Sequence, residues 1–259
     1  MGARIVTSVY GVISYLTFLV SFVYAIGFVG DVLVPKSIDR GGSADLTEAV
    51  FADLTLLGLF AIQHSVMARP GFKHWWVRII PAAAERSTYV LLSSLILMLL
   101  FWQWRPIPAP VWQLASTAMG PVLTGIFWLG WLTVLLSTFL INHFDLFGLR
   151  QAAAKLRGTD MPSTVFKMPL LYKIVRHPIM LGFLFAFWAT PNMSAGHLLF
   201  AVMTTGYILI ALQLEERDLI ATFGASYEQY RQRVPMIVPL WPTGRGEPDR
   251  ASKHLRPSA

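Results

Sequence analysis

The chain has 259 residues, of which 55% are hydrophobic and only 14% charged, and its mean hydropathy is +0.55. Soluble domains carry about 25% charged residues, so this composition excludes an ordinary soluble enzyme and predicts an integral membrane protein. The absence of cysteine excludes a disulfide, a Cys-ligated metal and a Cys nucleophile.

The N-terminal half contains four apolar runs that are long enough, or nearly so, to cross a bilayer, which takes about 20 helical residues. They are Ile5–Val29, Leu46–Met67, Tyr89–Trp104 and Val122–Ile141. The first run is too long for a signal peptide, and no small-residue cleavage site follows it, so we expect a retained span. The third run is short, but Trp102 and Trp104 at its end suit the aromatic belt of a membrane interface.

The C-terminal half contains a half-length apolar run, Ile179–Thr190, followed by Pro191-Asn192 and a full run, Gly196–Leu214. We expect the short helix to enter the membrane and turn back, paired with the helix that follows. The predicted fold is therefore an all-α integral membrane protein with about five transmembrane helices, a C-terminal half-length helix hairpin and a cytoplasmic cofactor-binding region. Residues 1–141 form the N-terminal four-helix membrane part, 142–240 the cofactor-binding region with the membrane hairpin and a cytoplasmic helix, and 241–259 a disordered tail.

The distribution of basic residues predicts the topology. With the N-terminus in the cytoplasm, 18 of the 21 Lys and Arg residues lie on the cytoplasmic side, a strong positive-inside bias. Both termini are then cytoplasmic, and a water-soluble cosubstrate would bind segment 142–178 or the tail from residue 215. The net charge of +7 reflects this topology and attraction to the lipid bilayer, and no nucleic-acid-binding module is visible.

Arg176-His177-Pro178 opens a membrane helix, where a proline at the first position is favourable. A helix N-terminus beside an arginine suits an anion or a nucleotide. The alternative is an interfacial Arg with a His that caps the helix.

Glu215-Glu216-Arg217-Asp218 marks the point where the last span leaves the bilayer. One carboxylate there suits a cationic or hydroxyl-bearing ligand, and the alternative is a solvated helix face. Phe223, Tyr227 and Tyr230 follow within three helical turns, where aromatic rings can stack on a base or lie near a cation.

Together these residues resemble the isoprenylcysteine carboxyl methyltransferase superfamily of membrane enzymes that use S-adenosylmethionine. The resemblance rests on Tyr172, Arg176-His177-Pro178, Gly182, the apolar hairpin, Glu215-Glu216, Phe223-Gly224, Tyr227, Tyr230, Arg233-Val234-Pro235 and Pro239. Nearly the whole chain, including Phe60–Arg69, Glu85–Tyr89 and Ile141–Gln151, resembles members that convert methanethiol to dimethyl sulfide. The segment around His64 also resembles a related group of denitrification-associated membrane proteins.

The resemblance implies a site for S-adenosylmethionine in the C-terminal half. The implied cofactor-binding residues are Phe166, Lys167, Tyr172, Arg176, His177, Pro178, Leu181, Glu215 or Glu216, Tyr227 and Tyr230. Two departures from the superfamily pattern are visible: Met180 replaces a frequent aromatic residue, and Thr164 replaces the usual His before the tyrosine.

Three further residues are predicted to lie at one depth on the cytoplasmic side: His64 ends the second span, and His143 and Asp145 follow the fourth. A His–Asp pair raises the basicity of an imidazole, which could then accept a proton from a thiol, whose pKa is about 8.5 in cysteine. We predict His64 or His143 as the catalytic base with Asp145 orienting it, while Arg150 or Arg176 holds the cofactor carboxylate. A packed histidine is the alternative at each position, and a metal site lacks a supporting motif.

The expected function is S-adenosylmethionine-dependent methylation of methanethiol, a small thiol substrate, to dimethyl sulfide, in a bacterial inner membrane. Other acceptors stay open, namely hydrogen sulfide, a longer thiol or a lipid carboxylate. A non-enzymatic channel or transporter also stays open, although the chain lacks repeated halves and places nearly all its ionisable groups at the cytoplasmic mouths of the spans and not mid-span.

Overall fold

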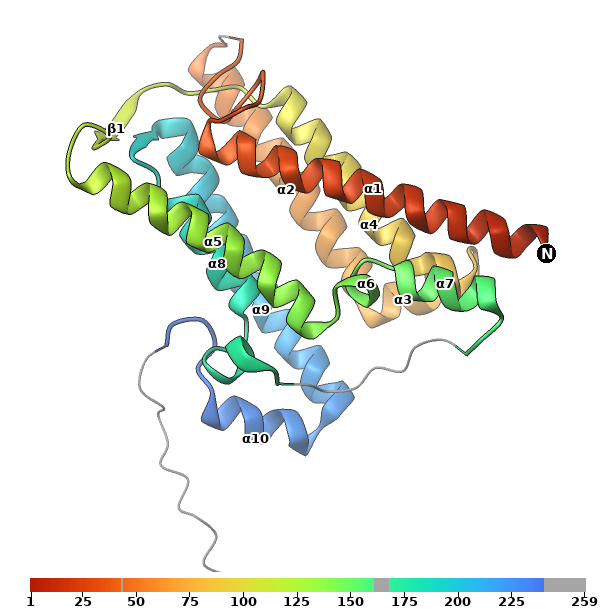
Figure 1. Cartoon of the computed structure of the whole chain (residues 1–259). Coiled ribbons are helices and arrows are strands. Elements are labelled where there is room, and N and C mark those ends of the chain that lie inside the picture. Colours follow the sequence, from red (N-terminus) through yellow and green to blue (C-terminus); the bar gives the residue numbers. More distant parts are fainter. Residues whose placement is uncertain (43, 161–167, 240–259) are drawn as a thin grey trace, which may run out of the picture.

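The structure is a computed structural model that describes residues 1–42, 44–160 and 168–239, so the predicted disordered tail lies outside the described residues. Five helices within these ranges are long and apolar enough to cross a membrane. They are α1 (Gly2–Gly30), α2 (Leu46–Ala68), α4 (Ala82–Gln103), α5 (Met119–Ile141) and α9 (Ala195–Phe223). This architecture, seen in Figure 1, confirms the predicted all-α integral membrane protein.

The shorter elements lie at the ends of the long helices. They are α3 (Pro70–Trp76), α6 (His143–Leu146), α7 (Leu149–Arg157), a 3-10 turn (Leu170–Lys173), α8 (Pro178–Trp188), α10 (Ala225–Arg233) and the strands β1 (Pro110–Gln113) and β2 (Asn192–Ser194). The two strands pair antiparallel, and Ala195 and Gly196 continue the contact by donating to the carbonyls of Ala109 and Ile107. This small sheet, which the hydropathy pattern did not indicate, closes one end of the bundle (Figure 1).

Two long helices extend well beyond their apolar runs. α4 begins at Ala82 and not at Tyr89, because the polar residues before Tyr89 remain helical and pack against α1. Tyr10 on α1 donates a 3.0 Å hydrogen bond to the hydroxyl of Thr88, which gives this polar turn a half-buried partner. α9 continues past Leu214 to Phe223, so Glu215 and Glu216 lie on a rigid helix.

The short helix α8 contacts the following helix α9, as expected, and packs more extensively on α5. Gly130 on α5 and Gly182 on α8 bring the two backbones together. A Cβ at Gly182 would lie 2.7 Å from the carbonyl oxygen of Gly130, and one at Gly130 would lie 2.6 Å from the carbonyl oxygen of Gly182. Small residues permit this close approach of helices in a membrane.

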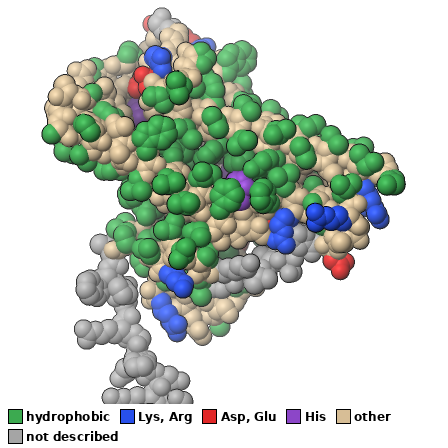
Figure 2. Space-filling view, in the orientation of Figure 1, with side chains coloured by type: hydrophobic (Ala, Val, Ile, Leu, Met, Phe, Trp, Pro, Cys, Tyr) green, Lys and Arg blue, Asp and Glu red, His purple; other side chains and the backbone are tan. Residues whose placement is uncertain are grey.

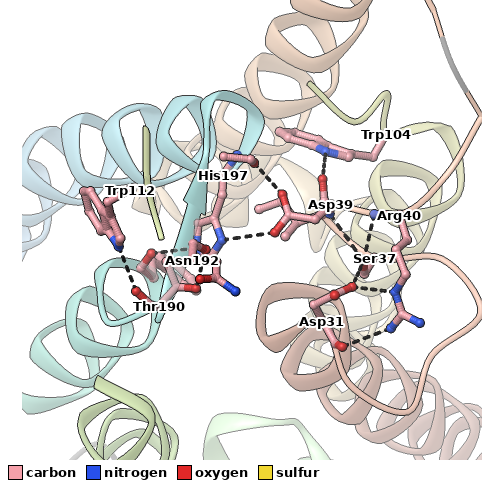
Figure 3. Close-up of polar contacts among 12 residues, drawn as sticks. Asp31, Ser37, Asp39, Arg40, Trp104, Trp112, Thr190, Asn192 and His197 are labelled. Carbon is pink, nitrogen blue, oxygen red and sulfur yellow. Dashed lines mark hydrogen bonds and ion pairs between the residues drawn. The ribbon is translucent and has the colours of Figure 1, made fainter. Parts of the chain in front are cut away.

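A polar network ties the loop after α1 to the start of α9 (Figure 3). The hydroxyl of Ser194 donates to Asp39 and accepts the backbone N–H of His197, so it caps α9. The ring of His197 is buried, with Nε2 2.9 Å from the carbonyl oxygen of Phe187 and Nδ1 4.0 Å from Oδ2 of Asp39. These contacts fix the end of the bundle opposite α10.

The aromatic core lies next to this network. Phe28, Phe101 and Trp104 pack together, and the indole N–H of Trp104 donates a 3.0 Å hydrogen bond to the carbonyl of Ile38. Trp104 is fully buried, so the prediction that it belongs to an interfacial belt is wrong; Trp102 is exposed, as that role requires. Hydropathy alone does not show which face of a helix end meets the protein.

The outer surface is predominantly hydrophobic over the long helices, and basic side chains gather toward α7 and α10 (Figure 2). We call this region the basic end. Its helices carry Lys73 on α3, Arg150, Lys155 and Arg157 on α7, and Arg231 and Arg233 on α10. Leu132, Leu136 and Phe139 on α5 are about half exposed, as expected for side chains that face lipid. An integral membrane protein follows, and the cytoplasmic placement of the basic end stays a prediction.

Candidate active site

Three buried, ionisable side chains meet where α8 begins. Nε and Nη2 of Arg176 lie 2.7 and 2.6 Å from Oε1 of Glu216, and Nε2 of His177 lies 3.1 Å from the same oxygen. All three side chains are less than 10% exposed. A buried carboxylate needs such partners, because charge removed from water is costly unless it is paired.

Arg176 also holds the C-terminal end of α10. Its Nη1 donates to the carbonyl oxygens of Arg231 and Val234, at 3.0 and 2.5 Å. The backbone N–H groups of Arg176 and His177 donate to the carbonyls of Pro235 and Met236. The guanidinium therefore joins α9, α10 and the start of α8, and this use of its donors favours a structural role over direct contact with a cofactor.

A buried tyrosine cluster lies beside these residues. The hydroxyl of Tyr230 donates a 2.6 Å hydrogen bond to the carbonyl of Tyr172, and the hydroxyl of Tyr172 donates to the carbonyl of Ser137 at 3.4 Å. The rings of Tyr227 and Tyr230 lie 5.8 Å apart. Burial raises the pKa of Tyr230 to about 12 and also raises the pKa values of Tyr172 and Tyr227, so all three remain neutral hydroxyls at physiological pH.

The two adjacent glutamates differ in their surroundings. Glu216 is buried, whereas the side chain of Glu215 is 47% exposed, with Oε2 3.7 Å from Nδ1 of His177. Glu215 is also within electrostatic range of Tyr172. Successive residues on a helix point about 100° apart, so one glutamate faces the protein and the other a partly open site. The sequence left this choice open.

Two other predicted cofactor residues are at the start of α8. Pro178 is the first residue of α8 and is buried, and Leu181 packs one turn later beside Ile208 and Leu212. Phe166 and Lys167 lie outside the described residues.

His64 lies between α2, α4 and α9, at a half-buried position that we call the His64 site. Its Nε2 is 2.7 Å from the hydroxyl of Tyr89, and its Nδ1 is 3.3 Å from the hydroxyl of Ser93. The ring stacks on Phe60 and meets the edge of Tyr207. His64 and Tyr89 are both half-buried, so neither side chain is sealed inside the protein.

His143 is held differently, at the junction of α5 and α6. Nε2 lies 2.9 Å from the hydroxyl of Tyr15, and Nδ1 lies 2.9 Å from the hydroxyl of Thr138. The ring stacks on Phe139 with centroids 4.2 Å apart and is 5% exposed. Burial lowers the pKa of His143, so the folded protein favours the neutral ring.

The expected pairing of His143 with Asp145 does not form. Asp145 accepts a 2.9 Å hydrogen bond from Gln151 and lies 3.9 Å from Nη1 of Arg150, while hydroxyl groups occupy both nitrogens of His143. His143 and Asp145 are two residues apart on α6, so their side chains point about 200° apart around the helix. Among the described residues, no group of three His, Cys, Asp or Glu side chains is arranged to hold a metal.

The burial of His143 predicts a pH dependence of stability. Its folded-state pKa lies below the ordinary 6.5, so the unfolded chain binds this proton more readily and stability is lost as pH falls below about 6.5. One group contributes at most about 1.4 kcal/mol per pH unit. We expect His143→Gln, which can bond both hydroxyls, to lose less thermal stability than the wild type between pH 7.5 and 5.5. Equal losses in both proteins would contradict this role.

The structure adds site residues that the sequence reasoning did not single out. Tyr89, Ser93 and Gln63 surround His64, and Tyr15 and Thr138 hold His143. In the sequence, each of these residues is visible only as a polar side chain inside or beside an apolar run. Serine, threonine and tyrosine are frequent at such positions for packing reasons alone.

The chain is similar to several known proteins. The profile of the NnrU protein family matches residues 54–225. Methanethiol S-methyltransferase 2 of Bradyrhizobium diazoefficiens is 62% identical, over 97% of each chain. Methanethiol S-methyltransferase of Mycobacterium tuberculosis is 59% identical, over 92% of this chain and 98% of the relative. Nurim of Bos taurus is 31% identical over 64% of this chain and 66% of its own. No solved structure matches.

Proposed function

The chain belongs to the NnrU family and, within it, to the methanethiol S-methyltransferases, and we propose that it transfers a methyl group from S-adenosylmethionine to methanethiol, giving dimethyl sulfide. The chain is thus a methyltransferase, and the alternative of a channel or transporter is set aside. The observation that carries the proposal is the identity of 62% over nearly the whole chain to a methanethiol S-methyltransferase.

The C-terminal site suits S-adenosylmethionine, which when bound supplies an electrophilic methyl group on a positively charged sulfur. Glu215 presents a half-exposed carboxylate, which can accept hydrogen bonds from ribose hydroxyls. Tyr172, His177 and Leu181 would complete the binding surface at the start of α8. Arg176 and Glu216 would hold that surface in place through their buried ion pair.

The reaction requires an anionic thiolate. The protein must therefore take up the thiol proton and exclude water from the thiolate that results. His64 suits the role of proton acceptor better than His143, since the side chain of His64 is half-buried whereas His143 is only 5% exposed. Asp145 and Arg150, which contact each other at 3.9 Å, would support the fold of the α6–α7 segment.

Binding and acceptor choice test the proposal together. We expect calorimetry on the detergent-solubilised protein to show binding of S-adenosylmethionine. Among hydrogen sulfide, methanethiol, longer thiols and a prenylated cysteine carboxylate, methanethiol should have the highest kcat/KM. Turnover of another acceptor alone would keep the methyltransferase and reject the proposed substrate. Failure to bind S-adenosylmethionine would reject the proposed methyl donor.

A substitution at the half-exposed glutamate tests the cofactor site. We expect Glu215→Gln to weaken binding of S-adenosylmethionine by about 10-fold or more, because charge-assisted hydrogen bonds are about twice as strong as neutral ones. The melting temperature should stay near that of the wild type, since this side chain is 47% exposed. Glu228→Gln, at an exposed position of α10, is the matched control and should bind normally. Normal binding by Glu215→Gln would remove Glu215 from the site.

A further inference from the structure

We propose that the hydroxyl of Tyr89 receives the thiol proton and relays its own proton to His64. This inference rests on the proposed function and assigns a catalytic residue, Tyr89, to that reaction. The structural observation is that the Tyr89 hydroxyl lies against the imidazole of His64 at the His64 site, between α2, α4 and α9.

The surrounding hydrogen bonds fix the tautomer of His64. The amide nitrogen of Gln63 faces the sulfur of Met67 at 3.1 Å, so its oxygen faces Ser93 and accepts the hydroxyl proton of Ser93 at 3.2 Å. The oxygen of Ser93 is then left to accept, and it lies 3.3 Å from Nδ1 of His64. Nδ1 therefore carries the proton, and Nε2 presents a lone pair.

This tautomer sets the direction of the bond between Tyr89 and His64. The Tyr89 hydroxyl lies 2.7 Å from Nε2 and 3.1 Å from Nδ1, and with the proton on Nδ1 it donates to the nearer nitrogen, Nε2. Both ring nitrogens of His64 are then engaged, and Phe60 stacks on the ring with centroids 5.1 Å apart. A thiol at the His64 site therefore meets the oxygen of Tyr89, which keeps a free lone pair, before it can meet the imidazole.

The step balances within the chain and the thiol. The S–H bond breaks and its proton forms a new O–H bond on Tyr89, while the original O–H bond of Tyr89 breaks and a new N–H bond forms on Nε2 of His64. Tyr89 stays neutral and donates a hydrogen bond to the new thiolate. The proton remains on His64 until the product leaves and water can accept it. Ser93 and Gln63 are positioning residues, because they act only through His64.

The His64 site and the cofactor site lie along the same helix. Tyr207, whose ring meets that of His64, and Glu215 are eight residues apart on α9, which is about 12 Å along the helix axis. Arg69, the residue after α2, pairs with Asp218 on α9 at 2.8 Å and ties the end of α2 to the helix that carries Glu215. A thiolate formed at Tyr89 would therefore arise about two turns of α9 from the residue proposed to bind the cofactor.

Tyr89→Phe removes the relay and keeps the ring. We expect kcat/KM for methanethiol to fall by about 100-fold or more, as for the loss of a general acid–base group, with S-adenosylmethionine affinity by calorimetry unchanged. A thiol that is already ionised in water at the assay pH, such as trifluoroethanethiol, should lose at most a few-fold. Tyr10→Phe is the matched control, since its hydroxyl bonds Thr88, the residue before Tyr89, and this variant should retain activity.

A second variant distinguishes loss of the relay from a folding defect in Tyr89→Phe. His64→Gln should show the same acceptor-dependent loss, and the double variant should lose no more than either single variant, because the two residues act as a unit. Wild-type activity in Tyr89→Phe, equal losses for both thiols or reduced cofactor affinity would each overturn the relay. If the wild type methylated no thiol, the proposed function itself would fall, which is distinguishable from failure of the relay alone.

Discussion

Glu216→Ala should destabilise the protein by about 3–5 kcal/mol and abolish turnover, because it leaves the buried charge of Arg176 without its partner. The side chains of Arg176 and Glu216 are only 9% and 8% exposed, so water cannot replace the lost carboxylate. The same change removes the acceptor of His177 at 3.1 Å. The end of α10 and the start of α8 would lose their shared anchor.

Reversible unfolding in mixed detergent micelles, followed by circular dichroism, measures this loss. Glu216→Gln keeps the shape and one acceptor oxygen, so its loss should be smaller. Glu215→Gln, at the adjacent position, should unfold like the wild type. A Glu216→Ala protein with wild-type stability and no affinity for S-adenosylmethionine would reverse the roles that we give to the two glutamates.

Gly182→Leu should also remove activity, through the crossing of α8 and α5. A Cβ at this position would lie 2.7 Å from the carbonyl oxygen of Gly130 and 2.8 Å from Cγ2 of Val134. Backbone atoms cannot move aside cheaply, so the helices must separate at a cost of about 3 kcal/mol or more. Because α8 begins at Pro178, beside His177, its displacement would also disturb the cofactor site.

A glycine on α9 gives the matched control for this substitution. A Cβ at Gly206 would meet nothing within 4 Å, so Gly206→Ala should be neutral or stabilising by up to about 1 kcal/mol. Gly182→Ala should fall between Gly206→Ala and Gly182→Leu in stability. Equal thermal stability of Gly182→Leu and the wild type would contradict the close helix crossing.

The spans were predictable because a bilayer forces each crossing segment to satisfy its own backbone hydrogen bonds. Apolar length therefore indicated α1, α2 and α5 to within a few residues at each end. The ends of α4 and α9 were missed, since Glu85 and Glu215 lie beyond the apolar runs but remain helical. Hydropathy indicates which residues can lie in the bilayer, but a helix can continue past the end of its apolar run.

The sequence indicated which residues belong to the site better than it indicated what those residues contact. The sequence placed Arg176 and His177 at a helix start, and the structure brings them to Glu216. It did not separate Glu216 from Glu215, because that depends on which face of α9 meets α10. Nor did it indicate that Tyr15 and Thr138, and not Asp145, hold His143, since Tyr15 is distant in the chain.

The most direct test of the central claim is to follow the methyl group itself. Purified protein would be given S-adenosylmethionine with a deuterated methyl group and unlabelled methanethiol, and the headspace analysed by gas chromatography with mass spectrometry. We expect dimethyl sulfide that carries one deuterated methyl group, above a heat-inactivated control. Unlabelled dimethyl sulfide alone, or none from a protein that binds S-adenosylmethionine, would contradict the proposed methyl transfer to methanethiol.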